Sequence, residues 1–127
     1  MVVISLKSMK LVPGNIFSSK EEYLKSLRWI ALASAKLKAG SGAATSILDF
    51  SASTGVHDGN SAIKLLLAGA KSVQLCSVLY QQGPMVVGNF IEELKNFMQG
   101  NGFERVADFC GSLNYANISN PTDFERV

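Results

Sequence analysis

The sequence predicts an α/β fold that forms part of a larger parallel sheet, on three observations. Two short apolar runs, at 47–52 and 71–75, have the composition of buried strands. A helical pattern of about three turns lies between them, so the three segments make a βαβ unit with parallel strands. A parallel sheet needs cover on both faces and neighbours on both edges, which two strands cannot supply. We therefore expect these segments to be part of a larger α/β domain whose parallel sheet is incomplete in this chain.

The composition fits one compact domain and excludes several classes of protein. Of the 127 residues, 47% are hydrophobic and 17% are charged, which is too apolar for a disordered tail. The formal charge of +2 is small and spread along the chain, which argues against a nucleic-acid groove. No apolar run approaches the ~20 residues that cross a bilayer, and the N-terminus lacks a signal-peptide pattern. We expect a cytoplasmic protein with reduced thiols and no membrane partner.

We divide the chain into three segments: an irregular or extended segment at 1–18, βα units at 19–111, and a polar tail at 112–127. A short strand is expected over Val2, Val3, Ile4 and Leu6, followed by turn residues at Pro13-Gly14-Asn15.

The first helix is expected to begin near Ser19, because Ser19 and Glu22 have the spacing of a capping box. Small residues at 39–46 predict a loop after a stop at Gly40. Apolar residues recur on one face of this helix: Tyr23, Leu27, Ile30 and Leu37.

Turn and cap signals place the remaining helices. Asp58 or Asn60 can cap the helix inside the βαβ unit, and Gly69 ends it. Pro84 suits the first turn of a later helix that stops at Gly100. A short helical turn follows with Phe103, Val106 and Phe109, and we interpret Trp29, Met85 and Met98 as core residues.

Both predicted strands end in a loop of small residues, Ser53-Thr54-Gly55 after the first and Cys76-Ser77 after the second. Ligands of α/β folds bind outside the carboxyl ends of strands, and two adjacent loops can aim backbone N–H groups at one anion such as a phosphate. A side chain at Gly55 would block close approach of the backbone to that ligand. Ordinary turn chemistry is the alternative explanation of this glycine.

Other reactive residues have structural explanations. His57 is the only histidine, and no carboxylate or second histidine is placed to orient it, so we interpret it as a loop residue near a helix start. Cys76 is either a nucleophile or, preferably, a small buried thiol at a strand end, and Cys110 is structural. Asp49 either faces the interior or pairs with a basic residue. No triad, Walker loop or metal-ligand cluster is present, so we expect no complete active site and no metal.

Several runs together resemble the C-terminal part of the dihydroorotate dehydrogenase family. The upstream residues Val12 to Ser19, with Ser26-Leu27-Arg28-Trp29, resemble a bacterial branch of that family. The run from Ser51 to Tyr80 is the most specific, and it includes Ser53-Thr54-Gly55-Val56-His57-Asp58-Gly59 and Val73-Gln74-Leu75-Cys76-Ser77. Asp108-Phe109-Cys110-Gly111-Ser112-Leu113 is similar to the closing element of the family.

The resemblance implies the C-terminal part of a (β/α)8 TIM barrel that binds FMN and oxidises dihydroorotate to orotate in pyrimidine biosynthesis. It implies that Thr54 and Gly55 match one FMN-phosphate loop, with Thr54 where the family usually has glycine, and that Cys76 and Ser77 match the next. The family's catalytic base and substrate-binding residues lie on earlier strands. No catalytic residue is therefore expected in this chain, and the chain alone is expected to be inactive.

Two alternatives remain open. One is a non-enzymatic half-barrel that binds phosphate or flavin and needs a partner, either the missing barrel half or a second copy, because exposed strand edges favour pairing. The other is a related FMN barrel that acts on another dihydropyrimidine, since the Gln-x-Cys-Ser pattern at 74–77 also occurs there. The electron acceptor is not specified by the sequence.

Overall fold

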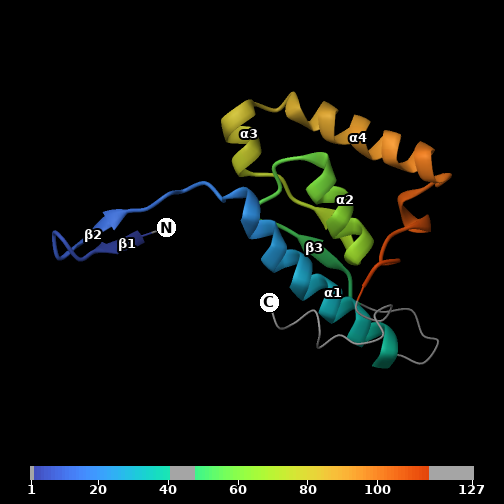
Figure 1. Cartoon of the computed structure of the whole chain (residues 1–127), viewed down its shortest axis with the longest axis horizontal. Helices are drawn as coiled ribbons and strands as arrows, with labels where there is room; N and C mark the ends of the chain where they lie inside the picture. The colour runs from blue at the N-terminus through green and yellow to red at the C-terminus, as the bar shows by residue number, and fades with distance from the viewer. Residues whose placement is uncertain (1, 41–47, 115–127) are drawn as a thin grey trace.

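The computed structural model describes residues 2–40 and 48–114 of the chain. Figure 1 shows a small strand pair with helices packed around it, and an N-terminal hairpin that extends away from them. The elements in chain order are β1 (Val2–Ser5), β2 (Lys10–Pro13), η1 (Lys20–Glu22), α1 (Tyr23–Gly40), β3 (Phe50–Ala52), α2 (Gly59–Ala68), β4 (Ala70–Val73), α3 (Ser77–Gln82), α4 (Val86–Asn101) and η2 (Val106–Asp108).

The predicted βαβ unit is confirmed: β3 and β4 pair in parallel, and α2 connects them. Ala52 lies opposite Val73 in this register, and no third strand joins the pair within the described residues. The first strand is shorter than expected, because Leu48 and Asp49 are exposed and precede β3. Ile47 and most of the predicted loop at 39–46 lie outside the described residues.

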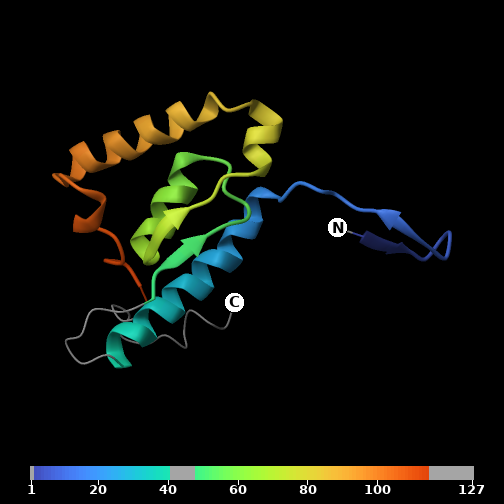
Figure 2. The ribbon, with the colours of Figure 1, turned by 180° about the vertical axis from the view of Figure 1, so that it is seen from behind.

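The core lies between the strand pair and the helices around it. Helix α1 packs against α2 and β3, and α4 packs against α2; Figure 2 shows β3 running alongside α1. The buried members of this core are apolar residues from α1 to α4, the two strands and the loop after β3: Ile30, Ala31, Ala52, Val56, Leu65, Ala68, Ala70, Val78, Val86 and Phe90.

The start of the first helix differs from the expected capping box. A 3₁₀ turn, η1, precedes α1, and the side chain of Ser19 makes no cap hydrogen bond. Instead the Glu22 amide donates to the Ser19 carbonyl oxygen at 3.2 Å. The tighter turn satisfies this amide with main-chain oxygen, so the hydroxyl is not needed as its acceptor.

The predicted cap of α2 is confirmed at Asp58. Its Oδ1 accepts hydrogen bonds of 2.7 Å from both the amide and the hydroxyl of Ser61. The helix ends at Gly69, whose φ of +123° favours glycine. A Cβ on Gly69 would lie 2.8 Å from the Cβ of Ser34, so this glycine also allows α1 to approach α2 closely.

The segment after β4 forms two helices where one was expected. Helix α3 ends at Gly83 and α4 begins at Val86, just after Pro84. The left-handed stop of α4 is Gly102, with φ +72°, and not Gly100. Residues beyond Asn114, including most of the predicted polar tail, lie outside the described residues.

Two residues interpreted as core are exposed: Trp29 is 67% exposed and Met85 is 85% exposed. Trp29 precedes the buried Ile30 by one position, which turns it away from the packed face of α1. Phe109 is fully buried, and its ring centroid lies 5.3 Å from that of Phe97 and 5.2 Å from that of Phe103. The predicted apolar turn thus forms a compact aromatic cluster.

The N-terminal segment holds two strands where one was expected. β1 and β2 pair antiparallel, with Val3 opposite Val12. Their apolar side chains Ile4 and Leu11 are 68% and 72% exposed. None of the helices in the described ranges combines the length and hydropathy needed to cross a bilayer.

Candidate functional site

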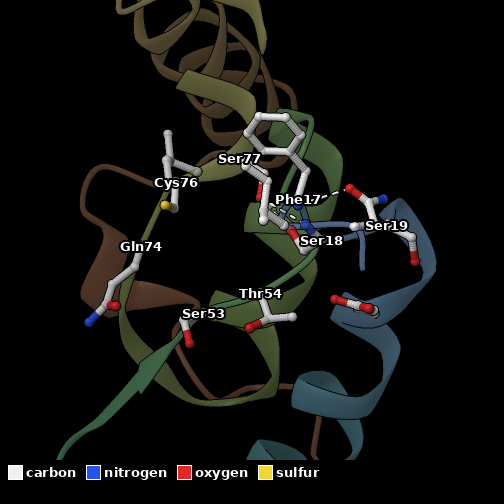
Figure 3. A pocket seen from close by; sticks show the side chains of 12 residues that line it. Phe17, Ser18, Ser19, Ser53, Thr54, Gln74, Cys76 and Ser77 are labelled. Atoms are coloured by element: carbon white, nitrogen blue, oxygen red, sulfur yellow. Dashed lines mark hydrogen bonds between the residues drawn. The ribbon is translucent and has the colours of Figure 1, made fainter. Parts of the chain in front are cut away.

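A cavity of about 480 Å³ lies where the carboxyl ends of β3 and β4 meet. Three segments far apart in the sequence form its walls, and Figure 3 shows their side chains around one space. The lining residues are Asn15, Ile16, Phe17, Ser18, Ser19, Glu22, Ser53, Thr54, Gln74, Leu75, Cys76 and Ser77. Of the four expected anion-binding residues, Thr54, Cys76 and Ser77 are in this lining and Gly55 is adjacent to it.

Thr54 and Gly55 turn the chain away from β3 through two consecutive left-handed conformations, with φ +76° and φ +73°. Left-handed φ is unusual for a β-branched residue, so Thr54 marks a strained point of the cavity wall. The exposed Thr54 side chain faces the cavity, and its amide donates to no other described residue.

Gly55 has a packing reason for being glycine, in addition to the turn chemistry that its left-handed φ supports. A Cβ there would overlap the amide nitrogen of Tyr23 and lie 2.9 Å from the Ser19 carbonyl oxygen. Its amide donates to the Ser18 hydroxyl at 3.1 Å. The missing side chain therefore makes room for the start of α1, and the Gly55 amide already has an acceptor.

Cys76 and Ser77 follow β4 and begin α3. Cys76 was expected to be buried, but its thiol is exposed and lines the cavity. Ser77 is buried, at 8% exposure. The backbone amides of both residues form no hydrogen bond with the rest of the described chain.

Ser18 connects the three walls, and the sequence reasoning did not identify it. Its amide donates to the Ser77 hydroxyl at 2.9 Å, and the two hydroxyls share a hydrogen bond of 3.0 Å. Its own hydroxyl also accepts from the Gly55 amide. The available signal was the pair of serines just before the first helix, which gives no indication of contacts so far along the chain.

His57 is a buried loop residue, as interpreted from the sequence, and its ring nitrogen Nε2 lies 2.8 Å from the Ser18 carbonyl oxygen. Because a carbonyl oxygen only accepts, Nε2 is the donor. Cys110 donates from Sγ to the Ala70 carbonyl oxygen at 3.2 Å, which fits a structural role. Asp49 is exposed, so it does not face a packed interior in the described structure.

The electrostatics of the cavity combine hydrogen-bond donors with two carboxylates that are adjacent in sequence. Glu22 lines the cavity, next to Glu21. Hydrogen bonds from the Glu21 backbone amide and from Ser19 lower the pKa of the Glu21 carboxyl below its ordinary value, so Glu21 is ionised at neutral pH. No group of three or more metal-ligating side chains gathers anywhere in the described ranges.

Comparison with known proteins finds relatives of part of this chain. A Streptococcus pyogenes protein named dihydroorotate dehydrogenase A (fumarate) is 43% identical over 61 residues, which is 48% of this chain and 20% of that protein. The Lactococcus lactis subsp. cremoris protein of the same name is 36% identical over 59 residues, 46% of this chain and 19% of that protein. This stretch of the chain is homologous to dihydroorotate dehydrogenase. No protein-family model matches the sequence.

The solved structures extend the likeness to the fold. The ligand-free dihydroorotate dehydrogenase of Eimeria tenella superposes with a TM-score of 0.58 and 23% identity, over 71% of this chain and 23% of that one. The chain spans about a fifth of the length of the curated dihydroorotate dehydrogenases that it matches. The βαβ unit and its helices thus have the fold of part of such an enzyme.

Proposed function

We propose that this chain carries the FMN-phosphate end of a dihydroorotate dehydrogenase, as a C-terminal portion of its (β/α)8 barrel. The observation that carries the proposal is the cavity at the carboxyl ends of β3 and β4, where Thr54, Cys76 and Ser77 line one space. Their amides have no acceptor among the described residues. Such amides are suited to the oxygens of a phosphate ester.

The donor set fits a phosphate, with one change from the sequence-based expectation. The Gly55 amide is held by Ser18, so it is left out of the proposed phosphate contacts. The hydroxyls of Ser18 and Ser77 stand next to the cavity and share one hydrogen bond, which uses one of their two protons. The other proton is available as a further donor. FMN bound here would supply the hydride-accepting flavin.

The complete enzyme is proposed to oxidise dihydroorotate to orotate. This chain aligns with only about a fifth of the length of its relatives, and we assign no catalytic base to it. Turnover needs a base held against the substrate, which contributes substantially to the rate of proton transfer. The 127-residue chain alone is therefore expected to give no dihydroorotate-dependent dye reduction.

Exposed apolar side chains on α1 support a partner for this unit. Leu24 is 51% exposed and Trp29 is 67% exposed, and β3 and β4 have no further strand beside them in the described chain. Parallel strands are normally covered on both faces and flanked by other strands. We propose that the rest of a barrel, or a second copy of this chain, covers this surface.

Titration of the purified chain with FMN tests the proposed site, with riboflavin as the phosphate-free control. Because the phosphate is the proposed anchor, FMN is expected to bind at least tenfold more tightly than riboflavin, as judged by quenching of flavin fluorescence (about 1.4 kcal/mol). Glu22→Gln is expected to tighten FMN binding, since it removes a negative charge from the lining, and to leave riboflavin binding unchanged. Equal affinity for the two flavins would overturn the proposal.

A further inference from the structure

His57 holds a wall of the cavity without lining it. The ring is buried at 8% exposure, and Nε2 donates to the Ser18 carbonyl oxygen at 2.8 Å. The histidine belongs to the loop after β3, whereas Ser18 precedes η1. This hydrogen bond therefore ties two of the three walls together from behind.

The peptide groups on both sides of Ser18 are fixed by different partners. The amide of Ser18 donates to the Ser77 hydroxyl, which fixes the peptide before it. The carbonyl of Ser18 accepts from His57, which fixes the peptide after it. With both peptides held, the Ser18 hydroxyl stays between the Gly55 amide and the Ser77 hydroxyl.

We infer that His57 is a positioning residue for the phosphate end of the flavin site, acting through Ser18 on the hydroxyl pair of Ser18 and Ser77. This inference rests on the proposed function. Loss of the ring donor would leave the Ser18 carbonyl without its partner in a partly buried place, where an unpaired polar group is unfavourable. The segment would shift, and the hydroxyl pair would no longer be aligned with the backbone amides of the other two walls.

Two substitutions separate the donor from the bulk of the ring. His57→Phe keeps the buried volume but removes the donor. His57→Gln can place an amide donor close to the position of Nε2. Loss of a hydrogen bond of this kind changes an equilibrium constant by about fivefold to tenfold, so His57→Phe is expected to raise the Kd for FMN by that factor. The Kd for riboflavin is expected to stay unchanged, and His57→Gln is expected to restore FMN binding.

A ligand-free measurement and a matched control complete the experiment. Hydrogen exchange of the Gly55 amide is expected to speed up in His57→Phe and in Ser18→Ala, and to stay slow in His57→Gln. Ser34→Ala is the control, because the buried Ser34 hydroxyl donates at 2.7 Å to the Ala68 carbonyl oxygen, near the amino end of β4. This control is expected to lower the melting temperature without changing the ratio of FMN to riboflavin affinity.

Each outcome has a distinct meaning. If the wild-type chain prefers FMN and His57→Phe keeps the same preference, the inference is wrong while the proposed function stands. If the wild-type chain shows no preference for FMN over riboflavin, the proposed function fails and this inference fails with it. Restored FMN affinity in His57→Gln, together with slow exchange at Gly55, is the result that supports the positioning role.

Discussion

Replacing Thr54 with glycine should stabilise the protein, because the backbone at this position is left-handed. Thr54 has φ +76° and is one of two non-glycine residues with positive φ in the described ranges. The left-handed conformation costs an L-residue roughly 1–2 kcal/mol, and β-branched residues tolerate it poorly. Glycine avoids this cost but loses roughly 0.5–1 kcal/mol more backbone entropy on folding. Taken at the middle of both ranges, the net expectation is a gain of roughly 0.7 kcal/mol.

Thermal unfolding followed by circular dichroism measures this change. A gain of this size corresponds to a rise of about 2–6 °C in Tm for a chain of this length. Thr54→Ala keeps a Cβ at the strained position and is expected to recover little of the gain. Ser53→Gly is the matched control, since Ser53 also lines the cavity but has no positive φ; it is expected to lose roughly 0.5–1 kcal/mol.

The same variant separates backbone strain from ligand contact. Thr54→Gly retains the amide proposed to face the phosphate, so FMN affinity is expected to stay as in the wild type. The reasoning is refuted if Thr54→Gly melts at or below the wild-type temperature while Ser53→Gly behaves as expected. In that case the threonine side chain would contribute contacts that outweigh the strain of its backbone.

Three further predictions follow from the same structure. Asp58→Ala is expected to cost about 1 kcal/mol in urea unfolding. Burial opposes ionisation of Asp58, but the hydrogen bonds from Ser61 outweigh it and lower the pKa of this carboxyl below 3.8. The stability that the ionised Asp58 contributes is thus present above pH 3.8 and is lost as the pH falls through the lower folded-state pKa. An unchanged loss of stability at acid pH in Asp58→Asn would contradict this. Phe109→Ala is expected to lose about 3–5 kcal/mol, and the half-exposed Ile91→Ala much less, so equal losses would refute the assigned core. Iodide is expected to quench Trp29 fluorescence in dilute protein, and protection at every concentration would show that α1 is covered.

Local signals explain the parts of the fold that the sequence could predict. The βαβ unit follows from two buried-type strands with an amphipathic helix between them, and the cap at Asp58 depends on residues only three positions apart. The stop at Gly102 was misplaced by two positions, because Gly100 and Gly102 are equally good candidates in sequence. Trp29 and Met85 were wrongly predicted to be buried for a similar reason, since hydrophobicity alone does not tell which face of a helix is packed.

The candidate site could be predicted only in part, because its assembly depends on long-range contacts. The two strand-end loops were found from their position after buried runs. Ser18 was missed, since nothing near it in sequence indicates a hydrogen bond to Ser77. The packing role of Gly55 was missed for the same reason: the main-chain atoms that need its missing side chain belong to Ser19, η1 and α1.

The Ser18–Ser77 link spans 59 positions, and the Ser18–Gly55 link spans 37. Chain closures of that length are costly in entropy and tend to form late in folding. The βαβ scaffold, by contrast, is held by closer neighbours along the chain. A protease cut between Ser19 and η1 would therefore detach one wall of the cavity from α1 and leave the scaffold intact, so that binding is lost before the fold is.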